Sequence, residues 1–230
     1  MAVGIKIMNQ EDLDHNPDQK KVWNTISAPW RNYVIKKLPI IVEFLKGKKG
    51  KIIDFGCGTG RNMLEEKDSV GKEYYGIDFS KGQLRHAKKY AKDQKLQAKF
   101  FEASLDKLDK RIFKNKMFDY GLFISTLHCL ETEDERKDSL KEFFRILKPG
   151  AEALISVWNL KDQRFKHVKN GGVYMSWYEQ GIPQMRYYYL YKRKEFLDIV
   201  RGVGFKILEI YKPTLHDRFS KKNLIVRVKR

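Results

Sequence analysis

Five apolar runs, each suited to a buried strand, recur through the middle of the chain and alternate with stretches of helical character. The runs are IDFG, YYGIDFS, AKFFEAS, FDYGLFIS and GAEALISVW. Strands that alternate with helices pair in parallel, because each crossover returns the chain to the same end of the sheet. The sequence therefore predicts an α/β fold built on a parallel sheet.

Helix signals accompany this alternation. Ser80 is placed to cap a helix over KGQLRHAKKYAKDQ, and EDERKDSLKEFFRIL runs into Pro149 and Gly150, where a helix stops. KEFLDIVRGVG predicts another helix, and FKILEIY and NLIVRVKR predict strands that pair antiparallel at the sheet edge. Before the first strand, QKKVWNTIS and LPIIVEFLKG predict two helices that cover the binding crevice.

The length of 230 residues suits one α/β domain with a full core. We expect a single domain over residues 1–230, with an N-terminal helical cap (1–48), a cofactor-binding core (49–158), an insertion (159–194) and a C-terminal helix with edge strands (195–230). The longest apolar runs, LPIIVEFL and AEALISVW, fall short of the roughly 20 residues that cross a bilayer. We expect a soluble, cytoplasmic protein without a membrane partner.

The two cysteines and the net charge indicate which covalent links, metal sites and partners to expect. Cys57 and Cys129 stand alone in separate segments, which predicts neither a disulfide framework nor a metal site. The 47 Lys and Arg residues exceed the 29 Asp and Glu residues, so the chain carries +18 at pH 7 and favours a nucleic-acid partner. The alternative is a lysine-rich composition that reflects the source of the chain.

Three alternate glycines follow the first apolar run in KIIDFGCGTGRNM. Gly56, Gly58 and Gly60 permit a sharp turn and a close approach of backbone to a ligand at the carboxyl end of a strand. A dinucleotide fingerprint needs a glycine where Arg61 stands, and the Lys-Ser/Thr ending of a P-loop is absent. A nucleotide-like ligand without phosphates is therefore favoured.

Two acidic residues specify that ligand further. Asp54 precedes the first glycine, where it would repel a pyrophosphate and attract an ammonium group. Asp78 closes the second strand, at a spacing that suits a carboxylate on ribose hydroxyl groups. S-adenosylmethionine has a ribose, an ammonium group and a sulfonium, and so it is the predicted cofactor. The alternative is that both aspartates only cap helices.

With these motifs in place, the chain resembles the class I S-adenosylmethionine-dependent methyltransferases through DFGCGTG, GIDFS, FDYGLFISTLHCL and LKPGAEALISVW. The resemblance covers nearly the whole chain. It implies a Rossmann-like, mostly parallel seven-stranded sheet with an antiparallel edge strand and helices on both faces. It also adds Phe79, Ser104 and Ser125 to the cofactor-binding residues Asp54, Gly56, Gly58, Gly60 and Asp78.

More narrowly, VWNTISAPW, ISVWNL, VYMSW, RYYYLY and VGFKILE are similar to segments of the tRNA wobble-uridine 5-carboxymethyl methyltransferases. That resemblance implies methyl esterification of 5-carboxymethyluridine in tRNA, RNA binding, and a small zinc-ribbon activator protein at the sheet edge. The chain departs from the subfamily at Cys129 and Tyr189, where histidines are usual, and at Val34, where an arginine is expected. Ser104 stands where an acidic residue is often found.

His128 is the candidate catalytic residue. A carboxylate acceptor needs no base, whereas an acceptor that carries a proton needs one within hydrogen-bond reach, and His128 follows the fourth strand. The alternative is a histidine that satisfies local backbone groups.

The insertion is the candidate substrate-binding segment, because it mixes aromatic and basic side chains that can stack on bases and hold phosphates. Trp177 is the preferred stacking residue, Arg186 the preferred partner of a phosphate or carboxylate, and Tyr189 a third candidate. Strand-like alternation in RYYYLY predicts that about half of the tyrosines are buried instead. The full set is Tyr174, Trp177, Tyr178, Tyr187, Tyr188, Tyr189 and Tyr191, with Arg164, Lys166, Lys169, Arg186, Lys192 and Arg193.

These observations favour a tRNA methyltransferase. Two other functions remain open: a small-molecule methyltransferase in which the aromatic insertion covers a compact acceptor, and a non-catalytic RNA-binding subunit.

Overall fold

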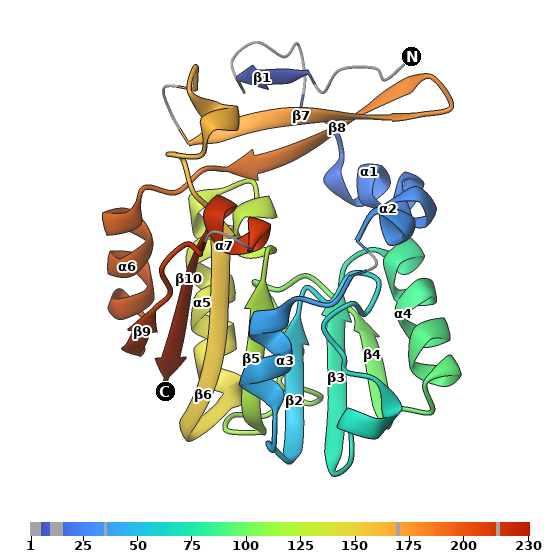
Figure 1. Ribbon diagram of the computed structural model, residues 1–230, viewed down its shortest axis with the longest axis vertical. Helices are drawn as coiled ribbons and strands as arrows, with labels where there is room; N and C mark the ends of the chain where they lie inside the picture. The colour runs from blue at the N-terminus through green and yellow to red at the C-terminus, as the bar shows by residue number, and fades with distance from the viewer. Residues whose placement is uncertain (1–5, 10–15, 35, 169–170, 215–216) are drawn as a thin grey trace.

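Seven strands form the main sheet, in the spatial order β4-β3-β2-β5-β6-β10-β9 (Figure 1). The computed structural model describes residues 6–9, 16–34, 36–168, 171–214 and 217–230. The parallel strands are β2 (Gly50–Phe55), β3 (Lys72–Asp78), β4 (Ala98–Glu102), β5 (Phe118–Ile124) and β6 (Leu147–Trp158). β10 (Asn223–Lys229) runs antiparallel to β6 and to β9 (Lys206–Ile210). This topology confirms the predicted mostly parallel sheet, with β10 one strand in from the edge.

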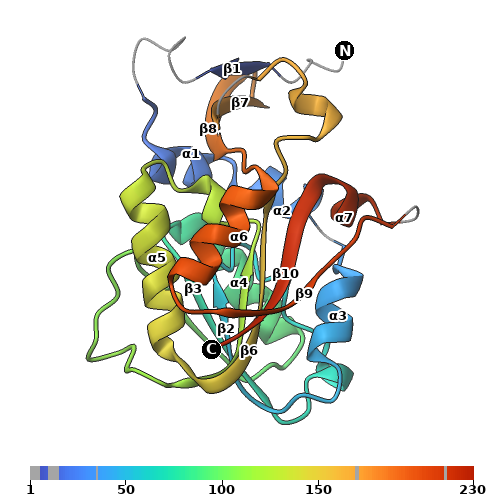
Figure 2. The same cartoon turned by 90° about the vertical axis from the view of Figure 1, so that its left-hand side faces the viewer.

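Helices cover both faces of the main sheet, as predicted. Adjacent residues of one strand point to opposite faces, so Ile53 packs against one set of helices and Ile52 against the other. The first face is covered by α5 (Glu133–Ile146) and α6 (Arg193–Gly202), and the second by α3 (Pro39–Leu45) and α4 (Lys81–Asp93). Figure 2 shows α5 and α3 on either side of the sheet.

The predicted alternation of strands and helices is wrong at two crossovers. Residues 56–71 between β2 and β3 form turns and one short 3₁₀ segment, η2 (Glu66–Asp68), and residues 103–117 between β4 and β5 form no helix. The glycines explain the first case, because Gly56, Gly58 and Gly60 all adopt positive φ, and right-handed helix requires negative φ. α3, which comes from the N-terminal segment, packs on the face beside β2.

The N-terminal segment contains three helices where two were predicted. α1 (Gln19–Thr25) and α2 (Ser27–Tyr33) divide at Ile26, and α3 follows. Pro29 explains the division, since a proline removes one backbone donor and its ring would clash with the carbonyl of Thr25 in a continuous helix. α1 and α2 lie above the carboxyl ends of β2 and β3 (Figure 1).

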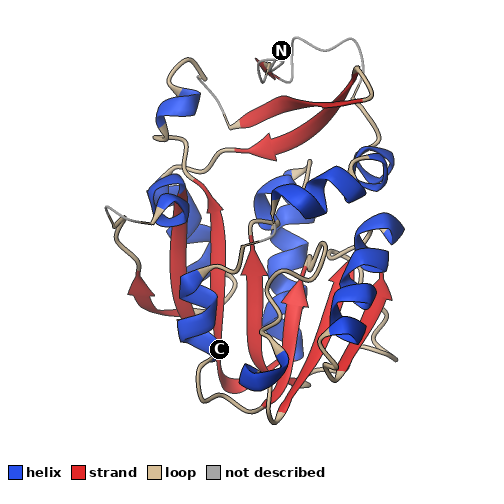
Figure 3. Cartoon of the chain, turned by 45° about the vertical axis from the view of Figure 1, so that its right-hand side comes forward, coloured by secondary structure: helices blue, strands red, loops and turns tan. Residues whose placement is uncertain are grey.

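A second sheet lies over the carboxyl ends of the main sheet (Figure 3). β7 (Gly172–Glu179) and β8 (Ile182–Tyr189) form an antiparallel hairpin, and β1 (Ile7–Asn9) pairs with the outer side of β7. Trp23, Ile26, Val173, Tyr188 and Leu190 form the core between this sheet and α1. The insertion is therefore held by the N-terminal segment. None of the helices in the described ranges has the length and apolar character needed to cross a membrane.

Candidate active site

The glycine turn after β2 forms the floor of the site. Gly56 has φ +82°, and a Cβ there would collide with the side chain of Thr126. Gly60 has φ +83°, and a Cβ there would lie 3.1 Å from the Ala87 Cα. Only glycine fits these two positions without displacing the loop after β5 or helix α4.

Lys37 stabilises the non-helical turn after β2 through hydrogen bonds to its carbonyl oxygens. Its Nζ donates hydrogen bonds to the carbonyl oxygens of Arg61, at 3.0 Å, and Met63. The same ammonium lies 4.0 Å from the centre of the Tyr90 ring. Burial lowers the pKa of Lys37 to about 8, although Glu65 opposes this shift. These bonds satisfy carbonyls that a helix after β2 would have bonded internally.

Asp54 lies beneath the turn with an unsatisfied oxygen. Its Oδ1 accepts a hydrogen bond from Asn62 at 3.0 Å, whereas its Oδ2 has no hydrogen-bond partner among the described residues. The residue is 2% exposed. Burial raises the pKa of Asp54 to about 7, against the effect of the Asn62 bond and the Arg61 charge. A carboxylate buried in this way favours a cationic ligand.

Asp78 lies at the end of β3, in the strand next to Asp54. Its Oδ2 accepts a hydrogen bond from the Gly58 N–H and its Oδ1 one from the Ser80 N–H, both at 2.9 Å. Burial raises the pKa of Asp78 to about 6, and these backbone bonds limit the shift. Because β2 and β3 are adjacent and parallel, their carboxyl ends bring both aspartates to one side of the glycine turn.

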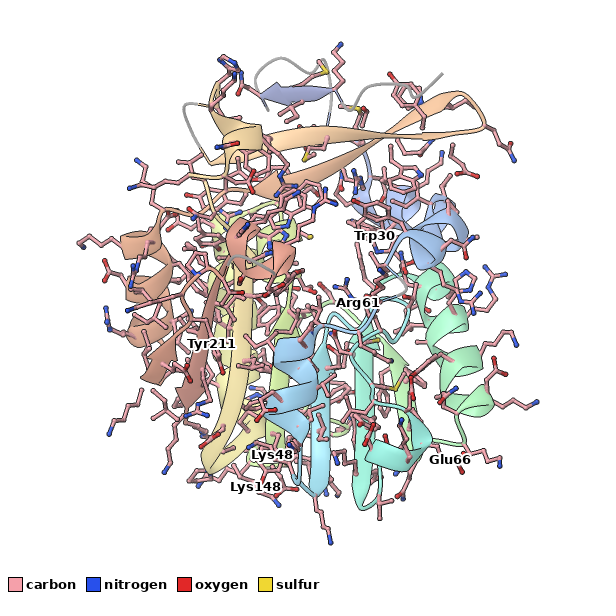
Figure 4. The ribbon with its side chains drawn as sticks, viewed as in Figure 1. Trp30, Lys48, Arg61, Glu66, Lys148 and Tyr211 are labelled. Carbon is pink, nitrogen blue, oxygen red and sulfur yellow. The ribbon has the colours of Figure 1, made fainter. Side chains whose placement is uncertain are left out.

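Two adjoining cavities open above the turn. Counting space that is open to solvent, one has an empty volume of about 640 Å³ and the other about 540 Å³. They share Gly56, Asp78, Phe79, Thr126 and Cys129. Figure 4 shows Trp30 of α2 and Arg61 of the turn directed toward the same space, and both line the larger cavity.

Most of the predicted cofactor residues come together here. Gly56, Gly58, Asp78, Phe79 and Ser125 line the larger cavity, and Ser104 lines the smaller one. Asp54 and Gly60 lie behind the lining, where Asp54 bonds Asn62, a lining residue. Val34 and Cys129, two positions that depart from the subfamily pattern, also line the larger cavity.

Sequence reasoning missed several lining residues. Gln83 is 2% exposed, and neither atom of its side-chain amide has a hydrogen-bond partner among the described residues. Trp23 and Trp30 come from the cap, and Arg61 and Asn62 from the turn. The spacing of glycines and acids gives no signal for Gln83, Trp23 or Trp30, whereas Arg61 and Asn62 directly follow the glycine motif.

His128 is not brought into either cavity. It is 1% exposed, its Nδ1 accepts a hydrogen bond from the Trp158 N–H at 3.3 Å, and its ring stacks on the Trp158 ring. Burial, with a smaller effect from Arg164, lowers the pKa of His128 to about 3. These observations favour the alternative interpretation, in which the histidine satisfies a backbone group.

Arg186 and Trp177 lie next to the larger cavity, across from the cap. The Arg186 guanidinium lies 5.2 Å from the ring centre of Trp30 and 5.3 Å from that of Trp177. One nitrogen donates to the Tyr188 hydroxyl at 2.8 Å, while the buried Nε has no hydrogen-bond partner among the described residues. No carboxylate in the described ranges pairs with this cation, which is 4% exposed.

Tyr189 lies elsewhere. It lines a separate groove with Arg136, whose guanidinium lies 4.0 Å from its ring centre, and its hydroxyl donates to Glu195 at 2.5 Å. Four of the six tyrosines in this set are buried, which is more than the expected half. Strict alternation fails, however, because both faces of β8 are covered and the adjacent Tyr187 and Tyr188 are each 2% exposed. Lys169 lies outside the described residues.

The site fits S-adenosylmethionine. The Asp78 carboxylate and the unsatisfied amide of Gln83 line the larger cavity, where they can bond polar groups of a ligand, and the buried Asp54 carboxylate lies behind that lining. At Gly58, which lines the larger cavity, a Cβ would have no neighbour nearer than the Gln83 Oε1 at 3.9 Å, so a ligand can lie against the backbone there. Among the described residues, no group of three or more histidine, cysteine or acidic side chains is arranged to hold a metal ion.

Comparison with known proteins identifies a family match and relatives of this chain. Residues 52–150 match a family described as a methyltransferase domain. A protein of Encephalitozoon cuniculi, named as a methyltransferase without a stated substrate, is 28% identical over 69% of this chain and 71% of its own length. The tRNA (carboxymethyluridine(34)-5-O)-methyltransferase of Schizosaccharomyces pombe is 26% identical over 82% of this chain and 89% of its own.

Other relatives are much longer than this chain. The tRNA (carboxymethyluridine(34)-5-O)-methyltransferase ALKBH8 of Mus musculus is 28% identical over 65% of this chain, and that match spans 21% of the mouse protein. The match therefore covers about a fifth of that relative's length.

Solved structures share the fold. A methyltransferase of Methanosarcina mazei aligns with a TM-score of 0.68 at 21% identity, over 85% of this chain and 98% of its own. A Burkholderia thailandensis N1-methyltransferase with bound S-adenosylhomocysteine aligns with a TM-score of 0.70 at 15% identity, over 97% and 94%. A complex of the Trm112 methyltransferase activator with a methyltransferase of Haloferax volcanii gives 0.66 at 14% identity, over 94% and 99%.

Proposed function

We propose that this chain, a class I S-adenosylmethionine-dependent methyltransferase that uses S-adenosylmethionine as its cofactor, esterifies the carboxylate of 5-carboxymethyluridine at the wobble position of tRNA. Two relatives whose names state this activity support the proposal. The observation that carries it is Arg186, a buried cation without a carboxylate partner among the described residues.

Arg186 is a suitable receptor for an anionic acceptor. A buried charge without a counterion is costly, and its cost falls when a ligand supplies the opposite charge. The guanidinium is close enough to the cavity that its charge lowers the pKa of Cys129, although burial dominates and raises that pKa to about 12. Cys129 lines both cavities. A carboxylate that enters the cavity beside Cys129 is therefore attracted by the positive charge of Arg186.

The chain supplies binding and orientation for this reaction. When bound, S-adenosylmethionine supplies a methyl group on a sulfonium centre, and a carboxylate oxygen that accepts it has no proton to lose. Trp30 and Trp177, whose ring centres lie 5.6 Å apart, provide apolar surface beside the guanidinium for a base. A reaction without proton removal agrees with the position of His128, whose Nδ1 is already bonded to backbone.

Transfer of labelled methyl groups to tRNA, followed by nucleoside mass spectrometry, tests this function. The substrate is tRNA that carries 5-carboxymethyluridine, with and without a zinc-ribbon activator. Arg186→Met is expected to lower kcat/KM by about 100-fold, because it removes a charged hydrogen bond of roughly 3 kcal/mol. His128→Asn keeps an acceptor for the Trp158 N–H, and we expect it to stay within about fivefold of the unmodified protein.

Cofactor affinity and near-UV circular dichroism show whether each variant is folded. Label found only in small molecules contradicts the proposal and favours a small-molecule methyltransferase. RNA binding without methyl transfer, even with the activator, favours a non-catalytic subunit. A tRNA product whose formation is unaffected by Arg186→Met shows that another group holds the acceptor.

The proposal includes three further elements: tRNA as a bound partner, a zinc-ribbon activator, and a cytoplasmic location. The net charge of +18 favours a polyanionic partner. The likeness to a methyltransferase solved in complex with the Trm112 activator supports the second element.

A further inference from the structure

Tyr33 presents an aromatic ring beside the active site. It is 66% exposed, and every other Phe, Trp and Tyr side chain in the described ranges is at least partly buried. It ends helix α2 and lies 5.5 Å, between ring centres, from both Trp30 and Trp177. Since Trp30 lines the larger cavity, Tyr33 lies directly outside that cavity. Because the fold leaves most of the Tyr33 ring exposed, the ring is available to contact a ligand.

Two arginines accompany Tyr33. Arg31 lies on the same helix and Arg85 lies on α4, against which α2 packs. His86 lies near both, because their charges add to burial in lowering its pKa. Neither arginine forms an ion pair with any described carboxylate. Two cations that both act on His86 and have no carboxylate partner among the described residues favour an anionic ligand.

Together, these three side chains have the properties of a single-stranded nucleic-acid site. Exposed aromatic rings stack on unpaired bases, and adjacent cations contact the phosphates that connect them. An acidic peptide would use the arginines but would gain little from the aromatic ring. The position outside the cavity also matches a nucleotide next to the one that enters it.

We propose that Tyr33, Arg31 and Arg85 form a flanking-nucleotide site, in which Tyr33 stacks on an unpaired base next to the modified nucleotide and the arginines hold its phosphates. The inference rests on the proposed function, because it assigns the RNA a second point of contact. It adds a reason for preferring a nucleotide within a loop over a free nucleoside.

The first experiment measures binding of a 17-nucleotide anticodon stem-loop RNA by fluorescence anisotropy, with S-adenosylhomocysteine at saturation. Tyr33→Ala is expected to raise the Kd by roughly 5- to 100-fold, the effect of losing one stacked base, while Tyr33→Phe stays within about twofold. The double variant Arg31→Gln/Arg85→Gln is expected to reduce the slope of log Kd against log salt by about 1.4, since each phosphate contact on a single strand contributes about 0.7.

A matched control is available in the loop before β5, where Lys114 lies near the amino end of β2. Lys110 and Lys114 are exposed, form no ion pair with a described residue, and lie in the loop before β5. Lys110→Gln/Lys114→Gln removes the same net charge, and we expect its salt slope to stay within about 0.3 of the unmodified protein. An equal loss of slope in both double variants would mean that only net charge matters, which overturns the proposal.

The outcome separates this inference from the proposed function. Methylation of tRNA with equal RNA affinity in Tyr33→Ala and the unmodified protein overturns the flanking-nucleotide site and leaves the function intact. Loss of RNA affinity in Tyr33→Ala, without methylation of any 5-carboxymethyluridine substrate, supports the site and contradicts the function. Tight binding of an acidic peptide that Arg31→Gln/Arg85→Gln abolishes, without RNA binding, assigns the surface to a protein and overturns the proposal.

Discussion

Two buried carboxyl groups dominate the chemistry at the scale of single residues. Burial holds the pKa of Asp54 at about 7 and that of Asp78 at about 6, so the protein retains protons at pH values where these groups are normally ionised. A cationic cofactor stabilises the ionised form. As the pH rises, the stability of the free protein therefore falls, whereas its affinity for the cofactor rises.

For Asp54, the sign follows from comparing the folded and unfolded pKa. The folded value of about 7 exceeds the usual 3.8, so the stabilising contribution is complete below pH 3.8 and is lost as the pH rises through 7. We expect Asp54→Asn to raise the melting temperature of the free protein at pH 8. The matching gain in the free energy of unfolding has an upper bound near 4 kcal/mol. Differential scanning calorimetry between pH 5 and pH 8 measures this change.

The same substitution should weaken cofactor binding. Loss of a charged hydrogen bond costs roughly 10- to 100-fold in affinity at pH 8, and the rise in affinity between pH 5.5 and 7.5 should become shallower. Isothermal titration calorimetry with S-adenosylmethionine gives both quantities. An Asp54→Asn variant that binds the cofactor normally, with an unchanged melting temperature, would show that the carboxylate is already neutral in both states.

At the scale of elements, the cap helices α1 and α2 complete a site that the main sheet leaves open. Asn24 of α1 fastens the cap to the loop after β3. Its Oδ1 accepts hydrogen bonds from the Ser80 hydroxyl at 2.9 Å and from the Gly82 N–H at 2.8 Å. The same Ser80 hydroxyl accepts from the Gln83 N–H and begins α4. The cap and the cofactor site are therefore joined through one side chain.

Replacing Asn24 by alanine should release the cap. We expect S-adenosylhomocysteine to dissociate roughly tenfold faster, because two hydrogen bonds of about 1 kcal/mol each are lost from a contact that covers the site. Stopped-flow displacement gives this rate, and hydrogen exchange over residues 19–33 reports the loosening. Asn32→Ala, an exposed position on α2, is the control. Equal rates and equal protection in both variants would show that aromatic packing alone holds the cap.

At the scale of the whole molecule, the edges of the main sheet offer places where another protein chain can bind. The main sheet ends in β4 on one side and β9 on the other, and each has one unpaired side among the described strands. Unpaired strand edges accept a further strand from another chain. We propose that the zinc-ribbon activator adds to such an edge.

We expect the chain to form a 1:1 complex with a zinc-ribbon activator from the same source, detectable by light scattering after size exclusion. Because strand addition shields amides, hydrogen exchange should slow at 98–102 or at 206–210. Protection confined to the cap or to the β7–β8 hairpin would place the activator over the active site. The absence of any complex would remove the activator from the proposal.

Much of the fold, and the grouping of most predicted cofactor residues at one end of the sheet, followed from sequence alone, because the signals are local. The apolar period of each strand, the capping Ser80 and the positive-φ glycines require no knowledge of distant residues. The meeting of Asp54 and Asp78 followed from topology, since adjacent parallel strands end at the same edge. The preference for S-adenosylmethionine over a dinucleotide also followed from these residues.

Tertiary structure decided what depends on residues far apart in the chain. Lys37, which lies far from the glycine turn in sequence, bonds the carbonyl oxygen of Arg61 in that turn, and His128 is buried because Trp158 and Tyr188 pack against it. Arg186 meets Trp30 across 156 positions of the chain, a contact that neither segment encodes by itself. Sequence patterns report how a segment divides between core and solvent, whereas the acceptor site depends on which segments the fold brings together.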